Sequence, residues 1–449
     1  MCEGFVDDVA FHSTGWQTRA RFVLICGLLL GLLAHQISCR LPEPELRKRK
    51  NVGVIFDTAY RPQSGAASPL LKSLDDVYAR YHRTLAEPVA VTYWGDDRSQ
   101  WRIHFATNRG IDSDPATGQP ARPNREVAAQ VRYGYSETVM PGRRRGQDPP
   151  LASSNKKGFG FLSSAKAEPA TDDVARLAEV HETSQAEFLR GIREQIQAST
   201  GRDLLLFVHG FNVGFDAAII RTAQLGLDLP FNGALCCYSW PSQGGISNYS
   251  ADERANALSV PPFRDFLAGL IQGVPAETRI HILVHSMGNR LVMQSLRELS
   301  ETPGPIKPID NLVLCAPDVG LRDFSEWIPG ARQMARRVTL YVGDSDTALI
   351  ASKALHGEQR VGDALPPVIY PGVETVDCSP VEMSFMGHSY YGGNVEVLCD
   401  LFSLLKEDHP ASKRDWLASQ ETPAGPFWRF HEQPTPVYFT WNFPDEKRF

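Results

Sequence analysis

Short apolar runs alternate with helix-forming stretches through the second half of the chain. Because long crossovers join parallel strands, this alternation predicts an α/β fold, with a mostly parallel central sheet and helices on both faces. Such sheets bind ligands at the carboxyl ends of their strands, so candidate functional residues are sought there. The predicted strands lie at 204–208, 233–240, 280–284, 312–315, 338–342 and 374–378.

The first half of the chain is less regular. Residues 70–85 are helix-prone, and apolar residues recur at helical spacing over 172–198, which predicts a helix in each segment. Residues 142–170 are rich in Arg, Pro, Ser, Lys and Gly, which predicts a mobile loop. Three further strands are predicted at 89–94, 101–107 and 131–139.

Composition and pattern together predict four regions. Residues 1–50 form a signal or anchor segment with a basic linker, and 51–100 form an N-terminal extension. Residues 101–408 form the α/β domain, and 409–449 form an extended tail that packs on it.

The apolar segment 22–39 contains no Asp, Glu, Lys or Arg. Its apolar core is short for a spanning helix, which needs about 20 residues, and fits the core of a secretory signal. Cys39 suggests a lipid-modified cysteine, and an uncleaved anchor is the other interpretation. The basic flank at 40–50 favours a cytoplasmic side. We expect membrane association or export, with the side of the membrane left open.

The bulk composition predicts a soluble globular domain and excludes little else. The 449 residues are 42% apolar with a net charge of −6, so nothing suggests a nucleic-acid partner. Cys236, Cys237 and Cys315 lie in apolar runs and are expected to be buried thiols, whereas Cys378 and Cys399 could pair. The sequence lacks the Cys-x-x-Cys spacing, and we expect no metal or other cofactor.

Ser286 is the candidate nucleophile. It follows an apolar strand, precedes a helix-forming stretch and lies in His285-Ser286-Met287-Gly288, the layout of a nucleophile elbow. Val284 occupies the first glycine of the usual Gly-x-Ser-x-Gly pattern. The alternative is a turn serine that caps the following helix.

The strand at 204–208 ends in His209-Gly210-Phe211-Asn212, which is typical of an oxyanion loop. We expect the backbone N–H groups of Phe211 and Met287 to form the oxyanion hole. His209 and Trp240 are assigned to the substrate-binding wall. A structural role for His209 and core packing for Trp240 are the alternatives.

In serine hydrolases with a nucleophile elbow, the acid and the base follow the serine in the chain. Asp346, after the strand at 338–342, is the first choice for the acid, with Asp344 and Asp318 as alternatives. His388, in the Gly-His-Ser loop after the last strand, is the expected base. His356 is better interpreted as a C-terminal helix cap.

Seven short motifs occur in order over about residues 100–400 and carry a family resemblance. The motifs are Phe105-Ala106-Thr107-Asn108-Arg109, Val208-His209-Gly210-Phe211-Asn212, Ser239-Trp240-Pro241-Ser242 with Tyr249 and Asp252, His285-Ser286-Met287-Gly288-Asn289-Arg290, Ala316-Pro317-Asp318-Val319, Leu340-Tyr341-Val342 with Asp346-Thr347-Ala348-Leu349, and Gly387-His388-Ser389-Tyr390. With these motifs the chain resembles the bacterial α/β-hydrolases catalogued as domain of unknown function 900, within the esterase/lipase superfamily. The resemblance implies an α/β-hydrolase fold with Ser286, Asp346 and His388 as catalytic triad. Val284 and Gly320 depart from the family pattern.

These residues predict a serine hydrolase that cleaves small or lipid-like carboxylic esters through an acyl-enzyme. The same triad could instead catalyse acyl transfer or amide cleavage. A membrane-tethered binding module without catalysis is the rival from a different class.

Overall fold

The computed structural model describes residues 55–56, 90–94, 98–112, 122–141, 175–229, 231–242, 248–302, 307–344, 347–381 and 395–431. The chain divides into two units, 1–52 and 53–449, and every described residue belongs to the second. The predicted helix at 70–85, the predicted loop at 142–170 and the apolar segment 22–39 lie outside the described residues. Within those residues, no helix is long and apolar enough to span a bilayer.

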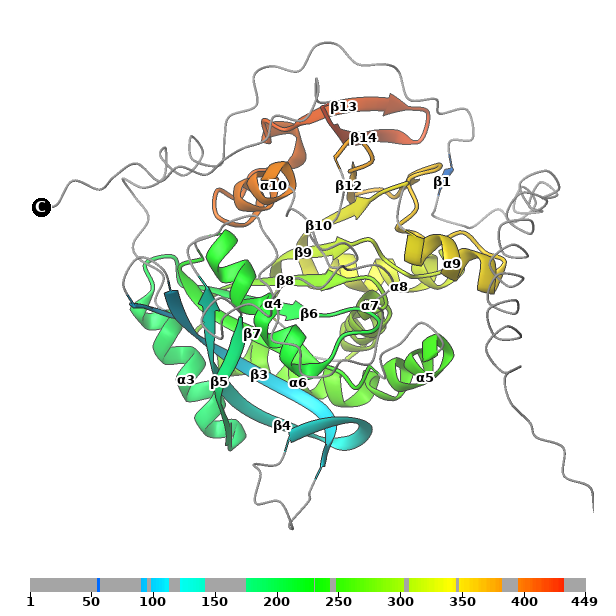
Figure 1. Cartoon of the computed structure of the whole chain (residues 1–449). Helices are drawn as coiled ribbons and strands as arrows, with labels where there is room; N and C mark the ends of the chain where they lie inside the picture. Colours follow the sequence, from blue (N-terminus) through cyan, green and yellow to red (C-terminus); the bar gives the residue numbers. More distant parts are fainter. Residues whose placement is uncertain are drawn as a thin grey trace, which may run out of the picture. The chain divides into compact units, whose positions relative to one another are not determined.

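A twelve-stranded sheet forms the centre of the fold (Figure 1). Its order is β13-β14-β12-β10-β9-β8-β6-β7-β3-β4-β5, and β2 pairs with β3. A separate antiparallel pair is formed by β1 (Ile55–Phe56) and β11 (Val368–Ile369). The strands of the large sheet are β2 (Val91–Trp94), β3 (Arg98–Asp112), β4 (Arg122–Pro141), β5 (Arg176–Thr183), β6 (Asp203–Val208), β7 (Gly233–Ser239), β8 (Arg279–His285), β9 (Ile309–Cys315), β10 (Ala335–Val342), β12 (Glu374–Asp377), β13 (Leu417–Thr422) and β14 (Gly425–Phe430).

The centre of the sheet is parallel and its margins are antiparallel. Every pair from β3 through β7, β6, β8, β9, β10 and β12 to β14 is parallel. The pairs β2–β3, β3–β4, β4–β5 and β13–β14 are antiparallel. All six strands predicted in the second half of the sequence lie in this parallel part, and the predicted α/β-hydrolase fold class is confirmed.

Helices cover both faces of the sheet. Alternate residues of β6 enter two separate cores: Leu204 and Leu206 enter one, while Leu205 and Phe207 enter the other. Both faces of the central strands are therefore buried, which is why they are continuous apolar runs. The first core receives α3 (Gln185–Ala198), α6 (Val260–Gly273), α7 (Gly288–Ser300) and α8 (Leu321–Met334), and the second receives α4 (Phe215–Asp228) and α10 (Val395–Leu405).

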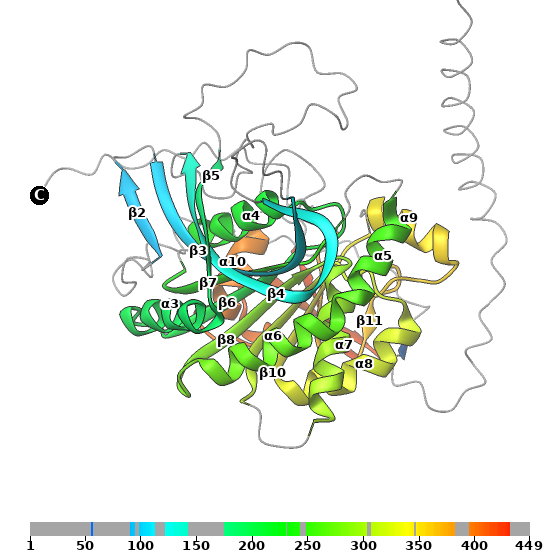
Figure 2. The ribbon, with the colours of Figure 1, turned by 90° about the horizontal axis from the view of Figure 1, so that it is seen from below.

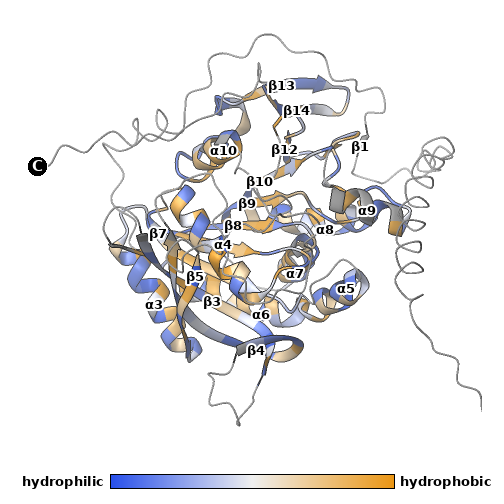
Figure 3. Cartoon of the chain, viewed as in Figure 1, coloured by the Kyte–Doolittle hydropathy of each residue, from blue (hydrophilic) through white to orange (hydrophobic). Residues whose placement is uncertain are grey.

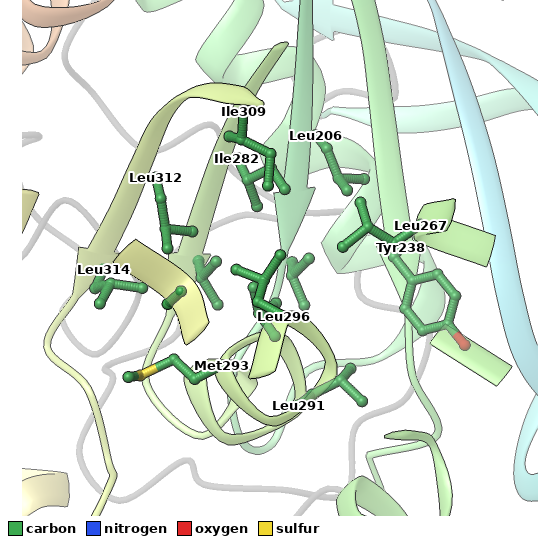
Figure 4. Close-up of a cluster of buried hydrophobic side chains, with 14 of the residues drawn as sticks. Leu206, Tyr238, Leu267, Ile282, Leu291, Met293, Leu296, Ile309, Leu312 and Leu314 are labelled. Atoms are coloured by element: carbon green, nitrogen blue, oxygen red, sulfur yellow. The ribbon is translucent and has the colours of Figure 1, made fainter. Parts of the chain in front are cut away.

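The figures show this layering. In Figure 2, α6, α7 and α8 follow one another along one face. Figure 3 shows hydrophobic colours on the central strands and hydrophilic colours on the edge strand β13. Figure 4 shows Leu291, Met293 and Leu296 of α7 packed under Ile282 and Leu312 of the sheet. Two further helices, α5 (Tyr249–Leu258) and α9 (Thr347–His356), lie in connections that follow β7 and β10.

The single helix predicted over 172–198 was wrong in its first half. Residues 176–183 form β5 rather than the first half of a helix, because they pair with β4 as an edge strand. The helix α3 begins only after Ser184, whose hydroxyl accepts a hydrogen bond from the Glu187 amide in a capping box.

The tail also departs from expectation. The segment predicted as an extended tail from residue 409 forms the hairpin β13–β14, which adds two strands to the main sheet through β12. The sheet therefore continues past the predicted domain boundary at 408.

The five cysteines in the described residues are free and buried. Cys236, Cys237 and Cys315 therefore have the expected state, and Cys378 and Cys399 are not paired with each other.

Candidate active site

Ser286 lies at the junction between β8 and α7, at the carboxyl edge of the sheet. Its φ of 49° places it in the left-handed region, which costs free energy for a residue with a side chain. Its amide donates to the Cys315 carbonyl at 2.9 Å. Its carbonyl accepts from the Asn289 side chain at 2.8 Å and from the Asp318 amide at 3.3 Å. These bonds hold the strained turn that was predicted as a nucleophile elbow.

Two glycines let the neighbouring loop approach this turn. A Cβ added to Gly210 would lie 2.8 Å from Cβ of Ser286 and 2.9 Å from Nδ1 of His285. A Cβ added to Gly288 would collide with the His209 carbonyl. The close approach expected at the first glycine of the usual motif occurs at these positions instead. Val284, at the first glycine position of the usual motif, is fully buried in the first core. This position therefore accommodates a side chain in this protein.

The two expected oxyanion donors lie on this pair of loops. Met287 caps the N-terminus of α7, where the helix dipole favours negative charge, and Phe211 follows Gly210. Within the described part of the chain, no hydrogen bond engages the Phe211 or Met287 amide. Both N–H groups are therefore available to an acceptor near Ser286.

The substrate-binding role assigned to His209 and Trp240 does not fit their positions. His209 is 1% exposed and Trp240 is fully buried, with the two rings stacked at a centroid distance of 5.1 Å. The Trp240 Nε1–H donates to the His209 carbonyl at 2.8 Å. Both side chains lie behind the oxyanion loop and support it, which agrees with the structural alternatives for these residues.

Arg109, Ser242 and Asp252 were quoted only as parts of family motifs, and their role becomes visible in the structure. The buried Arg109 guanidinium donates from Nη2 to the Val213 carbonyl at 2.9 Å. The Asp252 carboxylate accepts from the Asn212 amide at 3.3 Å and from the Ser242 hydroxyl at 2.5 Å. The Ser242 hydroxyl in turn accepts from the Val213 amide at 3.2 Å.

These side chains hold the backbone immediately after Phe211, at Asn212 and Val213. Burial lowers the pKa of Arg109 to about 9, so its guanidinium remains charged at neutral pH. No single sequence motif predicts this arrangement, because its members come from β3, from the segment after β7 and from α5.

Asp346 and His388 lie outside the described residues. The strands that precede them, β10 and β12, are parallel neighbours that end at Val342 and Asp377, which are paired in register. Both strands end at the edge of the sheet where β8 ends. Asp344, the alternative acid after β10, is exposed, and its amide donates to the Ser379 hydroxyl at 3.2 Å.

Asp318, the other alternative acid, is engaged in a buried network. Its carboxylate accepts from the Tyr249 hydroxyl and, at 2.6 Å, from Ser352. Arg290 and Arg360 approach it at 3.3 Å and 3.4 Å. Burial and the nearby Asp318 charge raise the pKa of Tyr249. Because these four groups engage both oxygens of Asp318, the geometry favours a structural role for it.

His356, the rival base, is the last residue of α9. Its Nδ1 lies 2.8 Å from the Ser352 carbonyl one turn earlier, and its Nε2 lies 2.7 Å from Glu253. This is the position of the C-terminal cap predicted for it. Among the described residues, no group of His, Cys, Asp and Glu side chains is arranged to hold a metal ion.

Two solved structures are similar to parts of this chain. No curated protein matches the sequence. Among solved structures, the chain is similar to an inhibited esterase B from Lactobacillus rhamnosis, at 12% identity and a TM-score of 0.25, over 46% of this chain and 78% of the esterase. It is also similar to a putative thioesterase from a Silicibacter species, at 15% identity and a TM-score of 0.21, over 40% of this chain and 80% of the other.

A family model described as alpha/beta hydrolase of unknown function matches residues 184–406. The matched segment begins at α3 and ends just after α10, and so includes the elbow, the oxyanion loop and both loops predicted to carry the acid and the base. Through residues 184–406, this chain belongs to the alpha/beta hydrolase family of unknown function, DUF900.

Proposed function

We propose that the chain is a serine hydrolase that cleaves carboxylic esters, with Ser286 as nucleophile, His388 as base and Asp346 as acid. The observation that carries the proposal is the backbone of Ser286, held at φ 49° beside Gly210 and the unengaged Phe211 and Met287 amides. A turn serine that only capped α7 would need neither the strain nor the adjacent amides.

The proposed reaction follows from the chemistry of these groups. His388 takes the proton of the Ser286 hydroxyl as the Oγ attacks the ester carbonyl. The Phe211 and Met287 amides donate to the resulting oxyanion. His388 then protonates the leaving alcohol, and water, activated by the same imidazole, releases the acid from the acyl-enzyme. Asp346 holds the imidazole in the tautomer that accepts the serine proton.

Fluorophosphonate labelling of the full-length protein tests the nucleophile. We expect one labelled peptide, containing Ser286, with labelling abolished in Ser286→Ala and greatly slowed in His388→Ala. Ser300→Ala, on the same helix α7, is the matched control and should label like the wild type. A folded protein that takes up no label would contradict the proposal and favour the binding-module alternative.

Matched substrates separate ester cleavage from its alternatives. We expect turnover of a p-nitrophenyl ester and much slower turnover of the corresponding anilide. Product partitioning in the presence of an added alcohol measures acyl transfer. If most of the acyl group passed to the alcohol even at a low alcohol concentration, the protein would be an acyltransferase instead.

We also propose that residues 22–39 associate the protein with a membrane. The support is the charge-free apolar sequence and its basic flank. Cell fractionation with a carbonate wash tests this proposal, because recovery of the full-length chain in the soluble fraction would contradict it.

A further inference from the structure

The Phe211 N–H, the proposed oxyanion donor, belongs to a peptide unit whose carbonyl group is also hydrogen-bonded. The Gly210 carbonyl and the Phe211 N–H are the two polar groups of one planar peptide, so fixing one fixes the direction of the other. The Gly210 carbonyl oxygen lies 2.9 Å from Nδ1 of the His209 ring.

The direction of this hydrogen bond follows from its partners. A carbonyl oxygen only accepts, so Nδ1 of His209 carries the proton. Burial and the Arg109 charge lower the pKa of His209 to about 3, which leaves the ring neutral and Nε2 with a lone pair. The Ser239 hydroxyl, 3.3 Å from Nε2, is therefore the donor there.

This series of hydrogen bonds begins at the positively charged Arg109 guanidinium. The Ser239 hydroxyl accepts from Nε of Arg109 at 2.9 Å and donates to His209, which donates to the Gly210 carbonyl. Hydrogen bonds in series polarise one another, and a hydrogen bond to a peptide oxygen makes the N–H of that peptide a stronger donor. The stacked Trp240 ring and the burial of His209 keep the imidazole from turning toward a substrate.

We propose that His209 is a positioning residue for the oxyanion hole: its Nδ1–H orients and polarises the Gly210–Phe211 peptide, and Ser239 and Arg109 fix the ring for that task. The inference rests on the proposed function, because it assigns a role in stabilising the oxyanion formed at Ser286. It replaces the substrate-binding role predicted for His209 by an indirect one.

Two isosteric amides test the Nδ1–H directly. Asn at position 209 places its amide NH₂ near the Nδ1 position, whereas Gln places it near Nε2. In the full-length protein we expect His209→Gln to lower kcat about 100-fold, within the range for loss of one oxyanion donor, with KM changed less than about twofold. His209→Asn should recover kcat to within about tenfold of the wild type. Equal kcat values for the two variants, or a change confined to KM, would overturn the inference.

Ser239→Ala provides a second test if either histidine variant fails to fold. It removes the hydroxyl that donates to Nε2 without changing the loop itself. We expect kcat to fall about threefold to tenfold at constant KM, because the ring keeps its Nδ1 bond but loses the polarising donor. An unchanged kcat would overturn the inference.

An alkyl trifluoromethyl ketone, which forms an oxyanion adduct with an active serine, supplies an independent measurement. Its inhibition constant should rise in parallel with the fall in kcat across the three variants. Absent labelling and turnover in the wild type would refute the proposed hydrolase, whereas an active wild type with unaffected variants would refute only the role of His209.

Discussion

Gly210 packs closely against Ser286: a methyl group on Gly210 would lie 2.8 Å from the serine Cβ, closer than side-chain carbons approach in proteins. The oxyanion loop and the elbow are therefore packed against each other with no space for a side chain between them. This contact sets how closely Phe211 approaches Ser286, so in the proposed hydrolase it would link catalysis to the packing of two segments about 75 residues apart.

The first prediction concerns this contact. Gly210→Ala should push the loop away from the elbow, slowing fluorophosphonate labelling and lowering kcat at least about tenfold, with a loss of about 1–3 kcal/mol in the free energy of unfolding. Gly214→Ala is the matched control, since a Cβ there meets nothing within 4 Å. Equal labelling rates for the two variants would show that the contact is irrelevant to the site.

The second prediction separates the two candidate acids. Asp318→Asn should lower the free energy of unfolding by about 3–5 kcal/mol, because Arg290 and Arg360 lose their shared buried partner. Asp346→Asn should leave stability nearly unchanged and lower kcat about 10⁴-fold through the wrong histidine tautomer. Urea unfolding and steady-state kinetics on both variants check this. The reverse pattern would make Asp318 the acid.

The third prediction concerns stability in acid. Burial lowers the pKa of His104 to about 3, as it does for His209, and also lowers the pKa of the buried His281. These rings are neutral when folded but protonate when unfolded below about pH 6.5, so the unfolded state binds more protons and stability falls from pH 6.5 toward pH 3. His104 and His209 each contribute a slope of about 1.4 kcal/mol per pH unit within that window.

His104→Phe tests this slope, because it removes one of the titrating rings while keeping an aromatic side chain beside Tyr135 and Phe188. Urea midpoints measured at several values between pH 7 and pH 4 should fall less steeply in the variant than in the wild type. Parallel curves would show that His104 does not titrate on unfolding.

The fourth prediction concerns the C-terminal hairpin. A chain ending at residue 408 loses β13, β14 and Arg414, which donates to Asp400 at 2.7 Å and to Glu374 at 2.8 Å. Asp400 is fully buried, so removal of its cationic partner should destabilise the sheet by about 3–5 kcal/mol. Soluble yield and thermal unfolding should be impaired in the 408 chain and normal in one ending at 431. Equal melting temperatures would contradict this.

Much of the fold was accessible from sequence because the central strands are buried on both faces. Their apolar runs are continuous, and the helices between them give a pattern that few other architectures share. The prediction failed at the margins. Residues 176–183 form an edge strand with little burial, so their pattern is weak, and the Ser184–Glu187 capping box would have marked the true start of the helix.

The C-terminal hairpin was missed for a related reason. Both of its strands are largely half-buried or exposed, and β13 lies at the sheet edge, so neither forms the continuous apolar run that identifies the central strands. The Thr422-Pro423-Ala424-Gly425 turn between them was the available signal.

The sequence alone determined the α/β class, the place of Ser286 after an apolar strand and the order of candidate acid and base, because each is encoded in neighbouring residues. Only the tertiary structure shows what His209, Trp240, Arg109 and Asp318 contact. Their partners come from different strands and helices, so burial and hydrogen bonding determine whether such a side chain meets substrate or supports a loop. A short motif identifies a candidate residue, whereas the packing of distant segments determines where its side chain points.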